Sequence, residues 1–279
     1  MLKQRVITAL VLLALLLPAL FARTAEPLAA LTLVLMAAAA WEWGRLNGLA
    51  MRGALRLSAV CLMLCLWVWH QRWSYDVPVD VWTWGGATWV LWGAWLMRRG
   101  VPAWQQMSRA IRLVIGVLML WLAWWALYRA KVIGVNFLLS VLTLVWVADI
   151  AAYFAGRTWG RRKLAPHISP GKSWEGVWGG MVAVLVLATG WLWAESQWSL
   201  DGPSVYTLLA AQGWPHMVLA TVFLTAMSVV GDLAESLVKR SAGAKDSSQL
   251  LPGHGGVLDR IDALLPTLPL ALMLVRLPA

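Results

Sequence analysis

The sequence has little charge for its length. Asp, Glu, Lys and Arg make up 13% of its 279 residues, whereas soluble domains carry about 25%. Hydrophobic residues reach 61%, so the chain has too few polar side chains to cover a surface exposed to water. This composition excludes a soluble enzyme, a nucleic-acid-binding module and a disordered chain. It predicts an integral membrane protein.

Cysteine is equally scarce. The two cysteines, Cys61 and Cys65, lie one helical turn apart within an apolar run. Two thiols are too few for a disulfide framework or for a thiolate metal site, so we expect both side chains to pack as small hydrophobic groups. Tryptophan, in contrast, occurs 22 times. Its apolar ring and polar N–H favour the membrane interface, and the remaining tryptophans are expected to fill contacts between helices.

Nine apolar runs approach the ~20 residues that cross a ~30 Å hydrocarbon layer. The first run resembles a signal peptide, because Lys3 and Arg5 precede it, but we expect it to be retained as a membrane anchor. The runs predict an all-α polytopic membrane protein whose single membrane domain covers residues 1–279. The nine predicted spans are 6–21, 28–43, 55–69, 81–97, 113–128, 132–155, 176–194, 216–231 and 263–277.

The positive charges predict the orientation of these spans. If the N-terminus is cytoplasmic, 18 of the 23 Lys and Arg residues fall on the cytoplasmic side. Membrane proteins concentrate Lys and Arg in their cytoplasmic loops, so we expect a cytoplasmic N-terminus and, with an odd number of spans, a C-terminus outside. This asymmetry accounts for the net charge of +10 without a nucleic-acid partner. The five cations left outside are Arg23, Arg72, Arg129, Lys131 and Arg276.

Acidic residues are rare but clustered near the C-terminus. The chain has thirteen, of which five fall between positions 232 and 262. On a helix that continues from the eighth span, positions 232, 235, 236 and 239 share one face, and positions 259 and 262 share another. The polar residues at these positions are Asp232, Glu235, Ser236, Lys239, Asp259 and Asp262. The spacing predicts two carboxylate-bearing helix faces on the cytoplasmic side.

A glycine-rich turn separates the two carboxylate faces. Its glycines allow backbone N–H groups to approach an anion closely, and carboxylates with phosphates are the ligands that Mg²⁺ prefers. We therefore predict a site for Mg²⁺ and a phosphate-bearing substrate, with nearby cations that neutralise the phosphates. The alternative is a solvated cytoplasmic loop whose charges pair with one another and with lipid headgroups. The predicted phosphate-binding residues here are Arg240, Lys245, Gly253, His254, Gly255, Gly256 and Arg260.

A second polar block, residues 149–179, joins the sixth and seventh spans on the same predicted side. Asp149 lies in an apolar run, where an ionised carboxylate needs a partner or a wet cavity. Further along, the segment 169–173 reads SPGKS, which is similar to part of a phosphate loop but lacks the full Walker pattern. We predict that Asp149, Lys172 and Ser173 contribute to substrate binding. Ser173 is also a candidate N-cap for the helix that follows.

The segment 231–262 closely resembles the signature of the phosphatidate cytidylyltransferase (CDP-diacylglycerol synthase) family. It reads GDLAESLVKRSAGAKDSSQLLPGHGGVLDRID. The upstream segment 151–176, AAYFAGRTWGRRKLAPHISPGKSWEG, is similar to the same family. Many members have Lys-Lys-Thr after Ser-Pro, whereas this chain has Gly171, Lys172 and Ser173. The resemblance is specific over residues 131–279, whereas residues 1–130 resemble the family only in hydropathy.

The resemblance implies a reaction and a site. The family transfers CMP from CTP to phosphatidate, giving CDP-diacylglycerol and pyrophosphate in phospholipid synthesis. Its members form homodimers in the inner (cell) membrane, with a polar funnel open to the cytoplasm and a Mg²⁺ site accompanied by a monovalent cation such as K⁺. Carried onto this chain, the metal carboxylates are Asp232 and Asp259, with Asp262 close by. Ser236 and Lys239 match polar positions in the funnel, and the expected catalytic set is Asp232, Ser236, Lys239 and Asp259.

Two other functions share parts of this pattern. A CTP-using lipid kinase that acts on a polyprenol or phytol would occupy the same membrane setting but would transfer the γ-phosphoryl group. An ion-coupled transporter would also carry an intramembrane carboxylate such as Asp149, although the acidic residues of this chain gather at the cytoplasmic end of the spans rather than at the midplane. A catalytically dead family member is a further alternative.

Overall fold

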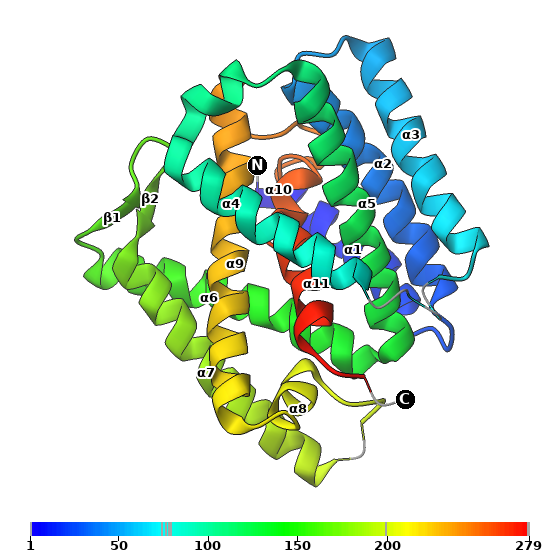
Figure 1. The fold of residues 1–279 in the computed structure, drawn as a ribbon, viewed down its shortest axis with the longest axis vertical. Helices are drawn as coiled ribbons and strands as arrows, with labels where there is room; N and C mark the ends of the chain where they lie inside the picture. Colours follow the sequence, from blue (N-terminus) through cyan, green and yellow to red (C-terminus); the bar gives the residue numbers. More distant parts are fainter. Residues whose placement is uncertain (1, 74, 76, 78–79, 199, 278–279) are drawn as a thin grey trace.

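A computed structural model describes residues 2–73, 75, 77, 80–198 and 200–277. The described chain is mainly helical (Figure 1). Its elements are α1 (Leu2–Leu20), α2 (Glu26–Leu46), α3 (Met51–His70), α4 (Asp80–Gln106), α5 (Arg109–Ile133), α6 (Val135–Trp159), β1 (Lys163–Ala165), β2 (Ser169–Ser173), α7 (Trp174–Gln197), α8 (Val205–Ala210), α9 (Trp214–Ser241), α10 (Leu258–Ile261) and α11 (Leu264–Leu274).

Six of the described helices are long and apolar enough to cross a membrane. They are α2, α3, α5, α6, α7 and α9. Five of them contain a predicted span, and α6 contains the predicted span 132–155 from residue 135 onward. The other three predicted spans fall on α1, α4 and α11. The prediction of an all-α polytopic membrane protein is therefore confirmed in its broad form, whereas the count of nine spans stays a prediction.

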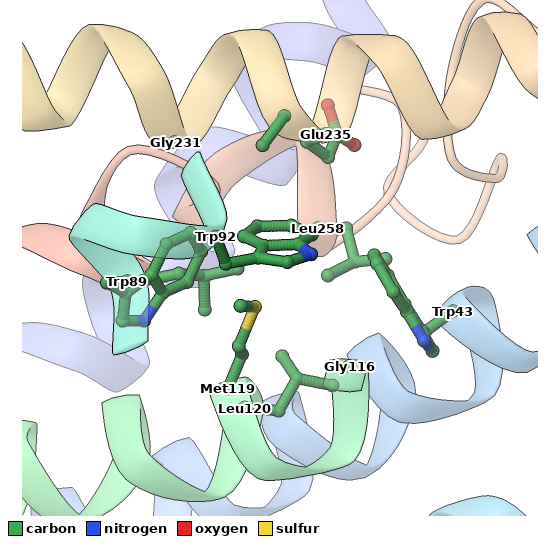
Figure 2. Close-up of a pocket in the computed structure, with 11 residues that line it drawn as sticks. Trp43, Trp89, Trp92, Gly116, Met119, Leu120, Gly231, Glu235 and Leu258 are labelled. Atoms are coloured by element: carbon green, nitrogen blue, oxygen red, sulfur yellow. The ribbon is translucent and has the colours of Figure 1, made fainter. Parts of the chain in front are cut away.

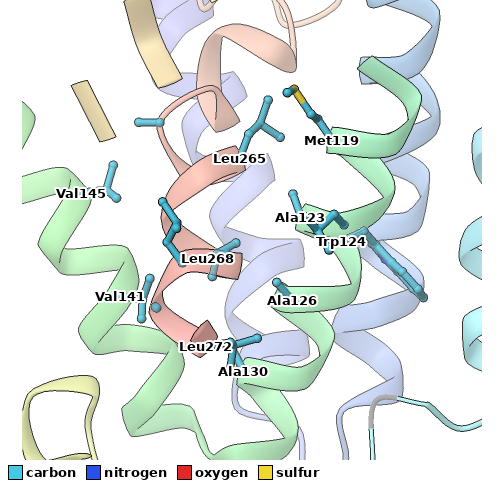
Figure 3. Packing of buried hydrophobic residues seen from close by; sticks show 14 of the residues in the cluster. Met119, Ala123, Trp124, Ala126, Ala130, Val141, Val145, Leu265, Leu268 and Leu272 are labelled. Atoms are coloured by element: carbon cyan, nitrogen blue, oxygen red, sulfur yellow. The ribbon is translucent and has the colours of Figure 1, made fainter. Parts of the chain in front are cut away.

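The ninth predicted span is shorter than expected. Helix α11 has 11 residues, which at 1.5 Å per residue extend about 16 Å, roughly half of a ~30 Å hydrocarbon layer. It lies at the centre of the bundle, where Leu265, Leu268 and Leu272 pack against α5 and α6 (Figure 3). Pro266, Pro269 and four leucines of α11 are buried, so these residues pack in the protein core; the leucines are Leu265, Leu268, Leu270 and Leu272.

The polar block after α6 contains the only strands among the described residues. Strands β1 and β2 pair antiparallel, with Lys163 opposite Ser173 and Ala165 opposite Ser169. This hairpin departs from the purely helical prediction, because Pro170 and the extended residues around it cannot continue a helix. It ends where Ser173 caps α7, its hydroxyl accepting a hydrogen bond from the Gly176 N–H at 3.2 Å. The N-cap prediction is confirmed.

Several polar segments gather at one end of the bundle. The C-terminal end of α9, the loop 242–257, α10 and the N-terminal end of α1 lie together at the upper end in Figure 1. Helix α10 packs against both α2 and α9, and β2 packs against α9. The turn 200–204 and α8 lie at the opposite end. The two polar blocks that the sequence analysis singled out therefore meet through α9.

Candidate active site

The hairpin brings Lys172 onto the polar face of α9. Its Nζ lies 2.6 Å from Asp232 Oδ2, and the pair is about one quarter exposed. On the same face, the Ser236 hydroxyl donates to Asp232 Oδ1 at 3.2 Å. Both Asp232 oxygens thus have a donor, one from β2 and one from the next turn of α9. The two polar blocks, which the sequence analysis placed on the same side of the membrane, therefore contact each other at Asp232.

Lys239 links the two carboxylate-bearing helices. Its Nζ pairs with Glu235, one turn earlier on α9, and lies 2.6 Å from Asp259 Oδ1 on α10. The Lys239 side chain is 11% exposed, and those of its two partners are exposed by less than that. Such a buried cation depends on its partners, because desolvation of an unpaired charge costs several kcal/mol. Lys239 therefore fixes the distance between α9 and α10.

The second oxygen of Asp259 is held by the loop before α10. Asp259 Oδ2 accepts from the backbone N–H of Ser247 at 2.9 Å and of Gly256 at 2.8 Å, and lies 2.9 Å from the Ser247 hydroxyl. Burial raises the pKa of this carboxyl, but Lys239 and these N–H groups outweigh burial and hold the pKa below its usual value. The Gly256 N–H, which the sequence analysis assigned to phosphate, is used by Asp259.

An apolar wall closes the far side of Glu235. Figure 2 shows Glu235 beside Trp92 and Leu258, with Met119 and Trp43 completing the surroundings. The space enclosed there is about 20 Å³, about enough for one water molecule. Glu235 is 3% exposed, so its charge is compensated from the Lys239 side. The sequence analysis placed Glu235 on the polar face but did not count it among the site residues.

Two further carboxylates lie within electrostatic reach of these pairs. Asp262, between α10 and α11, accepts from the Ala263 N–H at 2.7 Å. Burial, reinforced by the negative charge of Asp232, raises the pKa of Asp262 to about 8. Asp149 on α6 interacts with the charges of Lys172 and Asp232. The predicted site residues Asp149, Lys172, Asp232 and Asp262 thus belong to one electrostatic cluster.

The cluster satisfies part of what a metal ion requires. The cluster has five carboxyl groups and two ammonium groups, a formal excess of three negative charges when all are ionised; the groups are Asp149, Asp232, Glu235, Asp259, Asp262, Lys172 and Lys239. Mg²⁺ is commonly held by one or two carboxylates, with phosphates and water completing its coordination. Within the described part of the chain, however, no three His, Cys, Asp or Glu side chains are grouped as a metal site. Lys172 and Lys239 contact the oxygens of Asp232 and Asp259 that a cation would use.

The loop before α10 is anchored by Glu42, which the sequence analysis missed. Glu42 is fully buried on α2 and accepts from the backbone N–H of Val257 and Leu258 at 2.9 and 2.8 Å. The hydroxyls of Ser247 and Ser248 lie 3.1 and 2.5 Å from its oxygens. The signal was available, because Glu42 is a carboxylate within a predicted apolar span, as Asp149 is.

A basic cavity of about 730 Å³ opens beside this loop. Its lining includes the predicted phosphate-binding residues Lys245, Gly253, His254, Gly255 and Arg260. Helix α1 completes the cavity with Gln4 and Arg5, which the sequence analysis did not assign to the site. The Thr8 hydroxyl donates to the Pro252 carbonyl at 3.0 Å and holds α1 against the loop. Three permanent cations, from positions 5, 245 and 260, and one carboxylate, Asp246, line this cavity.

Two predicted phosphate-binding residues have structural partners. Arg240 donates through Nε to the Ile168 carbonyl at 3.3 Å and through a terminal nitrogen to the Ala244 carbonyl at 3.2 Å, so it ties the hairpin to the end of α9. Ser173 is buried and caps α7. Neither residue lines the basic cavity. Their contact with substrate stays a prediction.

An apolar groove of about 750 Å³ lies on the other side of α9. Side chains of α7, α9, the kinked end of α4 and the hairpin turn form its walls, and Arg98, Arg99 and His167 are the polar residues among them. The kink occurs at Gly100, whose φ of 69° favours glycine. Leu233, which lines the groove, directly follows Asp232 on α9. The groove and the carboxylate cluster therefore lie at the same level of α9, on different faces of the helix.

Comparisons with known proteins agree with the sequence signature. Residues 3–277 match the model of the cytidylyltransferase family. The phosphatidate cytidylyltransferase of Pseudomonas aeruginosa is 38% identical over 96% of this chain and 95% of its own length. The enzyme of the same name from Haemophilus influenzae is 50% identical over 49% of this chain and 44% of its own length. The one from Bacillus subtilis is 39% identical over 52% of this chain and 49% of its own length.

Proposed function

The chain belongs to the cytidylyltransferase family, and we propose that its lysine–carboxylate cluster transfers CMP from CTP to phosphatidate. The products are CDP-diacylglycerol and pyrophosphate. The observation that carries the proposal is the pairing of Lys172 with Asp232 and of Lys239 with Asp259 between a basic cavity and an apolar groove. One substrate is a water-soluble polyanion and the other is a lipid, and the two openings match them.

The basic cavity is the proposed site of the CTP phosphates. Its volume of about 730 Å³ falls within the ~300–1,000 Å³ typical of small-molecule pockets. Arg5, Lys245 and Arg260 supply positive charge, and the glycines at 253 and 255 lower the steric barrier to close approach of an anion. Asp246 is the one acidic residue of the lining. The cavity borders Asp259, because a Cβ atom at Gly255 would lie 2.8 Å from Asp259 Oδ2.

The apolar groove is the proposed site of the phosphatidate acyl chains. Its walls are lined mainly by hydrophobic side chains, which suit hydrocarbon. The cations Arg98 and Arg99 at α4 supply charge for the lipid phosphate as it enters. From there the step along α9 from Leu233 to Asp232 leads to the lysine–carboxylate cluster. The lipid would therefore reach the cluster without leaving the bilayer edge.

The chemistry is an in-line displacement at the α-phosphorus of CTP. A phosphatidate oxygen, already ionised at neutral pH, forms the new P–O bond, the bond between the α-phosphorus and the bridging oxygen breaks, and pyrophosphate leaves. No strong general base is needed, so the main tasks are to bring two anions together and to stabilise the transferring phosphoryl group. Lys172 and Lys239 are positioned to screen these charges, with Asp232, Asp259 and Ser236 fixing the two ammonium groups.

Metal ions belong to this proposal. Asp232, Asp259 and Asp262 would hold Mg²⁺, which when bound would neutralise phosphate charge and polarise the leaving group. Lys172 and Lys239 contact the same two carboxylates, so they would lie beside the cation and the phosphates. The surplus of carboxyl groups over ammonium groups in the cluster supports a bound cation. A second, monovalent cation such as K⁺ remains part of the proposal.

We also propose the orientation and assembly of the protein. The N-terminus and both polar blocks lie in the cytoplasm, where CTP is available, and the C-terminus lies outside; the distribution of Lys and Arg supports this. The protein resides in the inner membrane as a homodimer, as the family resemblance implies.

The position of the transferred phosphorus tests the reaction. Purified protein is incubated with phosphatidate, a polyprenol or phytol, Mg²⁺ and CTP that carries ³²P in either the α or the γ position, and the lipid is extracted. Nucleotidyl transfer predicts label in the lipid from α-labelled CTP alone. Label from γ-labelled CTP alone would instead identify a lipid kinase. Uptake of a solute driven by an ion gradient, with no labelled lipid, would identify a transporter.

A further inference from the structure

Glu42 connects the N-terminal half of the protein to the loop that holds Asp259. It lies near the end of α2, more than 200 positions before its four donors in the sequence. Its side chain is fully buried, and each carboxylate oxygen accepts from one backbone N–H and lies near one serine hydroxyl. All four donors lie on residues 247–258, the segment that leads into α10.

The donors explain why a carboxylate is required at this position. The N–H groups of Val257 and Leu258 open α10 and have no earlier carbonyl of that helix to bind. A buried N–H without an acceptor costs about 1–3 kcal/mol. Only a side chain with two acceptor oxygens can serve both N–H groups and also reach Ser247 and Ser248. A glutamine would turn an amide N–H₂ toward one of these donors.

Ser247 joins Glu42 directly to Asp259. Its hydroxyl lies 3.1 Å from Glu42 Oε2 and 2.9 Å from Asp259 Oδ2, and it has a single proton to donate. The two carboxylates therefore compete for one hydrogen bond, while the Ser247 N–H binds Asp259 throughout. Gly256 packs directly against this pair of residues, because a Cβ atom at position 256 would overlap both Ser247 Oγ and the Glu42 carboxylate.

We infer that Glu42 is a positioning residue that orients Asp259 through Ser247 and the start of α10. The inference rests on the proposed role of Asp259 in the reaction. Glu42 faces neither the basic cavity nor the apolar groove, so it acts through the loop and not on substrate. Removal of its negative charge lets the 247–258 segment shift, and the oxygens of Asp259 shift with it. Loss of such a supporting carboxylate commonly costs about 10–100-fold in activity or metal affinity.

The chain offers a matched control in Glu195. This carboxylate on α7 accepts from the Asn136 amide at 2.5 Å, from the Ser204 N–H at 2.8 Å and from the Ser204 hydroxyl at 2.7 Å. It therefore ties a loop to the start of a helix, α8, in the manner of Glu42. Because α8 lies at the opposite end of the bundle from α10, a Glu195→Gln substitution perturbs a similar network away from the site (Figure 1).

The test compares Glu42→Gln, Ser247→Ala, Glu195→Gln and Asp259→Asn with the unmodified protein in detergent. The measurements are the kcat and KM for each substrate, the thermal midpoint, and the rise of that midpoint on addition of Mg²⁺ with CTP, which requires no turnover. Glu42→Gln is expected to lower kcat by about 10–100-fold, with KM for phosphatidate unchanged, and to reduce the ligand-induced rise. Ser247→Ala is expected to show a smaller loss of the same kind. Glu195→Gln is expected to lower only the midpoint.

The variants separate two kinds of failure. If Asp259→Asn is inactive while Glu42→Gln and Ser247→Ala keep a normal kcat and ligand-induced rise, the positioning role of Glu42 is wrong and the proposed site stands. If Glu42→Gln does not fold, Ser247→Ala decides, and a normal kcat in that variant overturns the inference. Should Asp259→Asn keep normal turnover, the proposed site itself is wrong.

Discussion

Replacement of Asp259 by Asn is the most informative single change in the cluster. The substitution preserves shape but removes one charge and one acceptor oxygen. In the protein, Asp259 binds Lys239 through Oδ1 and three donors from Ser247 and Gly256 through Oδ2. An asparagine can keep one of these two sets of contacts. Its amide N–H₂ must then face the other set, which consists only of donors.

The cost follows from those contacts. If the asparagine oxygen keeps the two backbone N–H groups, the charge-assisted bond with Lys239 is lost, which costs about 1.5–3 kcal/mol of stability. Lys239 retains Glu235 as a partner, so the buried ammonium stays neutralised and the protein is expected to fold. The reaction loses more, because Asp259 is proposed to hold a cation against the phosphates. A loss of about 3–4 kcal/mol of transition-state stabilisation reduces kcat by about 10²–10³-fold.

The assay measures CDP-diacylglycerol formed from CTP and phosphatidate by purified Asp259→Asn protein, together with its thermal midpoint. Glu195→Gln provides the control for loss of a carboxylate charge in a hydrogen-bonded network remote from the cluster. A folded Asp259→Asn protein with kcat within a few-fold of the unmodified enzyme would refute the assignment of Asp259.

Three other changes test separate parts of the account. Gly256→Ala is expected to cost about 1–3 kcal/mol of stability and most of the activity, since the added methyl group overlaps the Glu42 carboxylate. Gly171→Ala is the neutral control, because nothing lies within 4 Å of its Cβ position, and equal thermal midpoints for the two variants would contradict the packing argument. Lys245→Gln is expected to raise the KM for CTP by about tenfold and to leave that for phosphatidate unchanged; an unchanged KM for CTP would place the triphosphate elsewhere. Gly171→Cys is expected to react with a membrane-impermeant maleimide in inside-out vesicles alone, because residue 171 is proposed to lie in the cytoplasm. The two native cysteines are buried and should not react. Labelling in right-side-out vesicles would reverse the orientation.

The sequence was sufficient to predict which polar residues of α9 share a face. The i, i+4, i+7 spacing on α9 placed Asp232, Ser236 and Lys239 on one face, and the structure adds the contacts of this face with Glu235 and with β2. That Lys172 reaches Asp232 could not be predicted from spacing, because the hairpin that carries it pairs through backbone hydrogen bonds that leave no periodic signal in so short a segment.

The contributions of the N-terminal half were harder to predict. Glu42 and Arg5 reach the site from helices whose sequences are mainly apolar, and nothing local indicates that α1 and α2 pack beside a loop 200 positions later. The intramembrane carboxylate was the available clue for Glu42. The sequence could not show that α11 is short and largely buried, because a buried core helix and a membrane span have the same apolar composition.

The most direct measurement is CMP transfer from α-³²P-labelled CTP into phosphatidate by the unmodified protein and by Asp232→Asn, in lipid vesicles with Mg²⁺. Asp232 is the residue at which the hairpin, α9 and the proposed cation meet. The account predicts labelled CDP-diacylglycerol from the unmodified protein and a loss of about 10²-fold or more in the variant, with its fold intact. Near-normal transfer by Asp232→Asn would contradict it.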